Sequence, residues 1–101
     1  LVQEMLKLYL MELPVIMLEM RNYASESNWF AIAQLAPKLR SIVGNLSLNN
    51  LKITIDEIEK FCNLQEQLNL VPTMIEEMAL HLETIYVQLN DKIKKYDPKK
   101  H

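Results

Sequence analysis

Hydrophobic residues recur at steps of three and four along most of the chain, in four separate runs. This spacing places hydrophobic side chains on one face of an α-helix. The chain also contains a single glycine and only four prolines, which are few turn formers for an all-β fold. The sequence therefore predicts an all-α protein, and the short connections between the runs predict an antiparallel up-down four-helix bundle.

Prolines and polar residues divide the runs. Pro14 lies inside the first run and predicts a kink or a brief break, because proline lacks the amide hydrogen that would pair with the carbonyl of Leu10. Ser27 and Asn28 are both candidate N-caps for the second helix, and Pro72 suits the first turn of the last one. The four hydrophobic runs predict helices over 6–23, 29–46, 51–62 and 74–93. Between them we expect a turn within 44–50 and a loop over 63–71, and Asp97-Pro98 should end the last helix.

The length of 101 residues fits a single domain with one hydrophobic core, spanning 1–101. Half of the residues are hydrophobic and 24% are charged, as in ordinary globular proteins. The net charge of −2 provides no electrostatic footprint for nucleic acid, and no apolar stretch is long enough for membrane insertion. Because the chain begins with Leu1 rather than Met, we expect it to be cut from a longer protein.

Residues with catalytic potential are sparse. There is no glycine-rich phosphate loop, no cysteine pair and no histidine pair at ligand spacing, so we expect no enzyme, no cofactor and no metal site. Glu77 and His81 share a helix face, but two ligands are too few for a metal, and we expect His81 to be a partly buried or boundary histidine beside Leu82. The lone Cys62 cannot form an internal disulfide, which favours the reducing cytoplasm. The acidic residues of the third helix, Asp56, Glu57 and Glu59, suggest a solvated face.

One segment carries a resemblance to a known family. Residues 29–41 read Trp-Phe-Ala-Ile-Ala-Gln-Leu-Ala-Pro-Lys-Leu-Arg-Ser, which is similar to the signature of histidine phosphotransfer (HPt) domains, Ala-His-x-Leu-Lys-Gly/Ser after an aromatic-led helix. Ala36, Leu39 and Leu46 match the family pattern directly. Arg40 takes the place of its lysine, and Ser41 that of its glycine or serine. The stretch from 9 to 14 also resembles the first long helix of the family.

The resemblance implies a four-helix phosphorelay module of a two-component system, with Pro37 where the phosphate-accepting histidine should stand. Proline offers no nucleophile, so phosphate acceptance is lost while binding of a receiver domain can survive. We therefore expect a degenerate HPt-like signalling module that docks the receiver of a response regulator or hybrid kinase. The predicted partner-binding residues are Gln34, Pro37, Lys38, Arg40 and Ser41. Pro37 also predicts a helix kink near residues 33–37.

Two other interpretations of the sequence remain open. A four-helix domain of a hybrid sensor kinase can resemble an HPt domain without binding a receiver, because fold does not dictate function. Phosphotransfer through another histidine is the second interpretation, and His81 is the only internal candidate.

Overall fold

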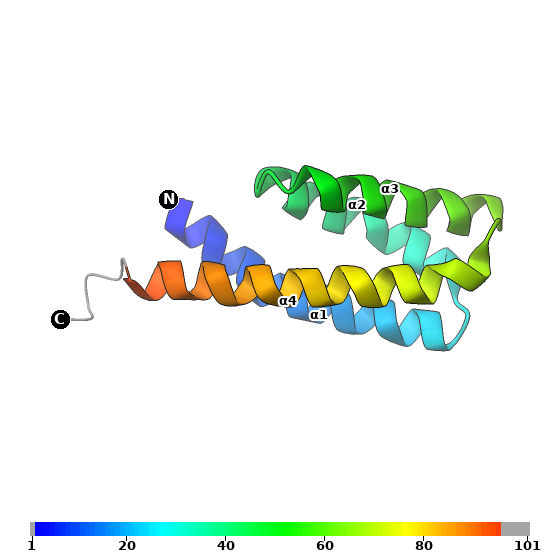
Figure 1. Cartoon of the computed structure of the whole chain (residues 1–101), viewed down its shortest axis with the longest axis horizontal. Coiled ribbons are helices and arrows are strands. Elements are labelled where there is room, and N and C mark those ends of the chain that lie inside the picture. The colour runs from blue at the N-terminus through cyan, green and yellow to red at the C-terminus, as the bar shows by residue number, and fades with distance from the viewer. Residues whose placement is uncertain (1, 96–101) are drawn as a thin grey trace.

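The computed structural model describes residues 2–95, which form four α-helices and one short 3₁₀ turn with no strand among them. α1 packs chiefly along α4, and α2 packs along α3, so the helices form two side-by-side pairs (Figure 1). The all-α class and the four predicted helices are confirmed. Their bounds are α1 Val2–Ser25, α2 Trp29–Asn45, α3 Asn49–Leu64, η1 Leu68–Leu70 and α4 Val71–Lys95.

A single hydrophobic cluster is built from the inner faces of the four helices. The buried side chains keep the predicted steps of three and four, because one face of a 3.6-residue helix meets its neighbours at these positions. Ile32, Leu39 and Val43 of α2 are fully buried, as are Ile55 and Ile58 of α3. None of the helices described here is both long and apolar enough to cross a bilayer.

Two prolines lie inside continuous helices. α1 runs through Pro14 and α2 runs through Pro37, so the predicted break at Pro14 is wrong. Both prolines are exposed and neither belongs to the buried core. Figure 1 shows the N-terminal turns of α1 slanting away from the line of its second half, which fits the predicted kink. The kink near Pro37 stays a prediction.

The connections are short and depend on polar residues. The Oδ1 atom of Asn28 accepts a hydrogen bond from the amide of Ala31 at 3.2 Å, so Asn28 caps α2 rather than Ser27. Ser27 itself adopts a left-handed φ of 54° and turns the chain. The predicted loop over 63–71 is shorter than expected, since α3 continues to Leu64 and a 3₁₀ turn leads into α4. Asp97-Pro98 lies outside the described residues.

Candidate functional site

The outward face of α2 forms a continuous exposed row. Because an α-helix has 3.6 residues per turn, residues at steps of three and four after position 30 fall on one side. The opposite side of the helix is buried in the core. We call this row the α2 stripe; its members are Phe30, Gln34, Pro37, Lys38 and Ser41, and all five are exposed.

Pro37 lies near the middle of the stripe, beside a shallow hollow between α2 and α3. The hollow has a volume of about 410 Å³, and its lining includes Pro37, Ser41, Gly44 and, from α3, Lys52. Gly44 has no side chain to fill the hollow, and a Cβ atom built there would meet no other atom within 4 Å. The surface around Pro37 is therefore low and open, and the bulk of another protein can approach it.

Arg40 turns from the stripe toward α3. Its Nη1 atom donates hydrogen bonds to Asp56 Oδ1, at 3.0 Å, and to Glu59 Oε1. The bond to Glu59 is the main reason that the pKa of the Arg40 guanidinium is raised above its ordinary value. Asp56 and Glu57 are exposed, as expected of a solvated face, whereas Glu59 is half-buried because Arg40 reaches it across the α2–α3 interface.

The charge of Arg40 is thus matched within the chain, whereas two nearby lysines are not matched. Lys38 and Lys52 are exposed, and neither makes an ion pair with another residue in the described range. They lie on α2 and α3, the two helices that carry the hollow beside Pro37. Arg40 also lines this hollow, but its guanidinium is already hydrogen bonded, so the two lysines carry the unmatched positive charge that a partner with carboxylates could meet.

Four of the five predicted partner-binding residues therefore share one exposed face, and Arg40 lies at its edge. Sequence reasoning missed Phe30, which is 71% exposed. The signal was present, because Phe30 precedes Gln34 by four residues and Pro37 by seven, the spacing of one helix face. Lys52 was also missed, and no local pattern could have found it, since its place beside Pro37 depends on how α2 and α3 pack.

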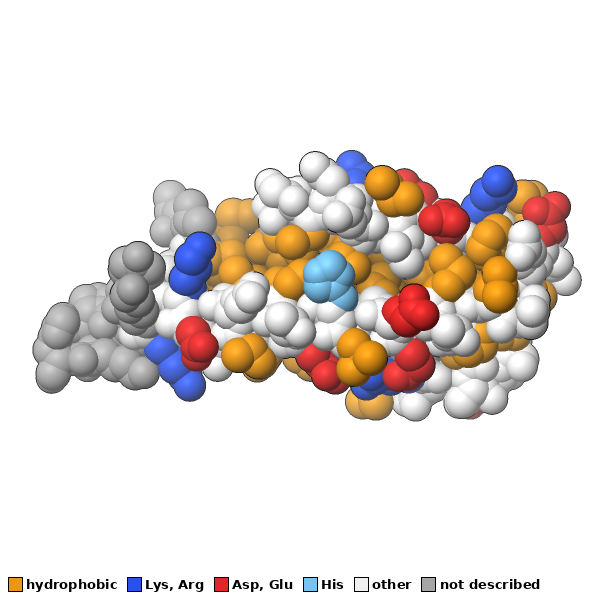
Figure 2. Space-filling model, in the orientation of Figure 1, with side chains coloured by type: hydrophobic (Ala, Val, Ile, Leu, Met, Phe, Trp, Pro, Cys, Tyr) orange, Lys and Arg blue, Asp and Glu red, His pale blue; other side chains and the backbone are white. Residues whose placement is uncertain are grey.

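His81 is exposed and lies at the boundary of the core, which is one of the two placements predicted for it. It lies on α4 beside a small hollow that also touches Leu51 and Thr54 of α3. The side chain one position later, Leu82, is 3% exposed, so the boundary between core and solvent falls between these two residues. Figure 2 looks onto this side of the molecule and shows hydrophobic side chains along the seam between α3 and α4.

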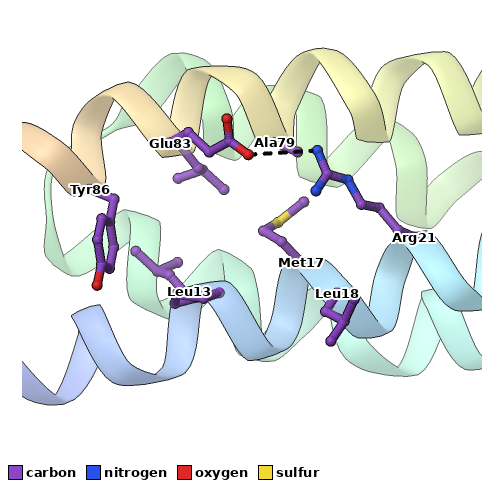
Figure 3. Close-up of a pocket in the computed structure, with 9 residues that line it drawn as sticks. Leu13, Met17, Leu18, Arg21, Ala79, Glu83 and Tyr86 are labelled. Carbon is purple, nitrogen blue, oxygen red and sulfur yellow. Dashed lines mark ion pairs between the residues drawn. The ribbon is translucent and has the colours of Figure 1, made fainter.

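A larger concave site lies between α1 and α4, on another side of the bundle (Figure 3). It has a volume of about 490 Å³, and its lining is mainly hydrophobic. Its charged groups are occupied with one another, because Arg21 pairs with Glu76 at 2.8 Å and approaches Glu83 at 3.9 Å. Apart from the Tyr86 hydroxyl, the polar side chains of this lining are already paired, so the site offers little to orient a small ligand.

Neither a metal centre nor an activated thiol is found in the part of the chain that the structure describes. No group of three His, Cys, Asp or Glu side chains comes together there in a way that could hold a metal ion. Cys62 is buried, and burial raises the pKa of its thiol to about 11, so the nucleophilic thiolate is scarce at neutral pH.

Comparison with known proteins adds no relative. No family model, no curated protein and no solved structure matches the chain. The resemblance to HPt domains therefore rests on the sequence alone, on residues 9–14 and 29–46.

Proposed function

We propose that this chain is a degenerate HPt-like signalling module that docks a receiver domain in a two-component phosphorelay without accepting phosphate. The observation that carries the proposal is the α2 stripe, an exposed and open surface with Pro37 at the position where the resemblance calls for histidine. We also propose the antiparallel HPt-like order of helices and a cytoplasmic setting in a hybrid kinase. Short connections between successive helices support the antiparallel order.

The chemistry of Pro37 excludes it as an acceptor. In an HPt domain a ring nitrogen of the histidine attacks the phosphorus of a receiver phospho-aspartate, and the aspartate carboxylate leaves. The backbone nitrogen of Pro37 belongs to a tertiary amide, whose lone pair is delocalised into the carbonyl. Its side chain contains only carbon and hydrogen. Pro37 therefore has no atom to which a phosphoryl group can be transferred.

The features needed for docking remain. Phe30 offers a large exposed aromatic ring at one end of the stripe, and aromatic residues often dominate the binding energy of an interface. Lys38 and Lys52 offer positive charge to the acidic side chains that surround a receiver's phosphorylation site. Arg40, held by Asp56 and Glu59, fixes α2 against α3 and so keeps the surface in shape.

A binding and transfer experiment tests the proposal. The chain is mixed with a phosphorylated receiver from the same cell, and binding and label transfer are followed together, with Pro37→His alongside. We expect wild type to bind and stay unlabelled, and Pro37→His to take up phosphate. Lys38→Glu should weaken binding about five- to tenfold, since charge reversal at an interface opposes association.

Lys94→Glu is the matched control, because Lys94 is an exposed lysine of α4 outside the stripe. It should bind the receiver as wild type does. Equal losses in Lys38→Glu and Lys94→Glu would show that net charge, rather than the α2 stripe, governs binding. If neither wild type nor Pro37→His binds any receiver, the structural-bundle alternative is favoured.

The exposure of His81 supports a second candidate function, phosphotransfer through that histidine. An imidazole open to solvent can reach a phospho-aspartate, although His81 lies on α4 and outside the α2 stripe. This candidate predicts that wild type becomes labelled and that His81→Ala abolishes the label. The degenerate-module proposal predicts no label in either protein.

A further inference from the structure

α1 carries hydrophobic side chains on two opposite faces. Its inner face is buried in the core, as expected of a helix in a bundle. The outer face of such a helix is ordinarily polar. Here the outer face presents a second hydrophobic row, whose members are Leu8, Met11, Val15 and Leu18, 51%, 72%, 56% and 60% exposed. We call these four residues the α1 row.

The α1 row has the spacing of a coiled-coil seam. Its residues follow one another at steps of three, four and three, so Leu8 and Val15 take the first position of a heptad while Met11 and Leu18 take the fourth. A β-branched residue at the first position with leucine at the fourth, as in Val15 and Leu18, favours two-stranded pairing. Asn22, the next first-position residue, is exposed, and asparagine at this position fixes the register of parallel pairs.

We propose that the α1 row docks a second copy of this chain, with the two α1 helices parallel and in register. The row is then its own partner, since each hydrophobic side chain packs beside the same residue of the second copy. Such pairing gives a two-fold symmetric dimer. The proposal uses no residue of the α2 stripe and does not depend on receiver docking.

The charges beside the row select the parallel arrangement. Lys7 occupies the seventh heptad position and Glu12 the fifth of the next heptad. In a parallel pair these positions face each other across the interface, so Lys7 of one copy meets Glu12 of the other. Centred antiparallel pairing would place Glu12 against Glu12, while Lys7 would face Arg21, whose charge is already paired with Glu76. In the described part of the chain neither Lys7 nor Glu12 already makes an ion pair.

The row is open to a second helix. Figure 3 shows Met17 directed toward α4, while Leu18, the next residue, points away from it. Met17 is correspondingly 6% exposed and Leu18 60% exposed. Met11 and Leu18 border hollows that they share with α4, but both side chains remain largely exposed, so the row stays open to a second helix.

Molecular mass in solution tests the proposal. Sedimentation equilibrium from about 10 µM to about 1 mM should show wild type passing from monomer to dimer, because an interface of two heptads is short. The doubly substituted Met11→Glu/Leu18→Glu protein should remain monomeric, with a dissociation constant raised at least about tenfold. Leu80→Glu is the control, since Leu80 is as exposed as Leu18 but lies on α4. It should dimerise as wild type does.

Circular dichroism first confirms that each variant is folded, which is expected because the substituted side chains are exposed. A wild type that stays monomeric up to about 1 mM would overturn the proposal. So would equal loss of dimer in Leu80→Glu. If Met11→Glu/Leu18→Glu keeps its mass profile but loses receiver binding, the occupant of the row is the receiver and the proposal is also wrong.

Cysteine cross-linking tests the direction of the helices. With a mild added oxidant, Leu8→Cys alone and Leu18→Cys alone should each form a covalent dimer if the helices are parallel. In antiparallel helices only a mixture of the two proteins would cross-link efficiently, since position 8 of one copy would face position 18 of the other. The native Cys62 does not compete, because it is buried.

A charge exchange gives an independent check. Lys7→Glu should raise the dissociation constant of the dimer several-fold, because it places a second carboxylate against Glu12 of the other copy. Adding Glu12→Lys in the same chain should restore dimerisation, since the opposite charges then face each other again. Failure of the double variant to recover would exclude the parallel in-register arrangement.

Discussion

The outer faces of α1 and α2 differ although the two helices are built alike. Both bury one hydrophobic face in the same core, and both contain one exposed proline in an unbroken helix. The α1 row is entirely hydrophobic at heptad spacing, whereas the α2 stripe combines three polar side chains with Phe30 and Pro37. Inner faces of the same kind therefore specify the fold, while the composition of each outer face indicates which kind of partner it can bind.

The sharpest test of this comparison sets an inner residue of α2 against its outer neighbour. Leu39→Ala should lower the free energy of unfolding by about 2–5 kcal/mol, because it removes buried methyl groups and leaves a cavity. Lys38→Ala should change it by less than about 0.5 kcal/mol, since Lys38 is exposed. Urea denaturation measures both. Similar values for the two variants would mean that the division of α2 into two faces is wrong.

The same division explains what could be predicted from sequence. Helix content and the inner faces follow from local spacing, since residues three and four apart share a face whatever the rest of the chain does. Asn28 was predicted as a possible cap, and four of the five site residues were placed on one exposed face for the same local reason.

Features that depend on packing between helices could not be predicted in this way. Arg40 meets Asp56 and Glu59, which lie 16 and 19 residues further along the chain, only because α2 and α3 pack at one particular rotation. His81 lies close to the edge of the buried face of α4, where a small rotation of the helix decides between burial and exposure. Local spacing carries no information about such rotations.

The two internal prolines allow α1 and α2 to be compared by making the same substitution, proline to alanine, in each helix. Pro14→Ala and Pro37→Ala should each raise the free energy of unfolding by about 2 kcal/mol. Each substitution restores a backbone hydrogen bond and relieves the crowding by the proline ring, which together stabilise the helix by up to about 3 kcal/mol. About 1 kcal/mol of this gain is lost because alanine leaves the unfolded chain more flexible. Thermal denaturation measures the gain. A clear gain at only one site would show that the other helix has already adapted to its proline.

If the bend at Pro14 helps to present the α1 row, Pro14→Ala should also alter the dimer dissociation constant. Pro37→Ala should leave that constant unchanged, because Pro37 lies outside the row. Pro37→Ala therefore serves as the control for the effect of added helix stability on self-association.

Burial on an inner helix face should also change the pKa of a thiol. Burial raises the pKa of Cys62 to about 11 from an ordinary value near 9, so the unfolded chain releases this proton at lower pH than the folded chain. Between pH 9 and about 11 the unfolded state binds fewer protons, and stability must fall as pH rises, by up to about 2 kcal/mol. Cys62→Ala should lack this component, so the difference between its pH profile and that of wild type isolates it. A constant difference across that range would show that the thiol is reached by water in the folded protein.

The smallest effect concerns the edge of the α2 stripe, where Arg40 and Lys38 should separate structure from binding. Arg40→Gln should lower the free energy of unfolding by about 0.5–1 kcal/mol, because it removes partly exposed ion pairs to Asp56 and Glu59. Lys38→Gln should leave stability unchanged but weaken receiver binding, since Lys38 has no ion-pair partner in the described chain. Chemical denaturation and binding are measured on both proteins. A contrary outcome is that Arg40→Gln weakens receiver binding more than Lys38→Gln does when the two proteins are equally stable. The guanidinium would then contact the receiver directly. Asp56 and Glu59 would orient the guanidinium for that contact rather than use up its hydrogen-bonding capacity.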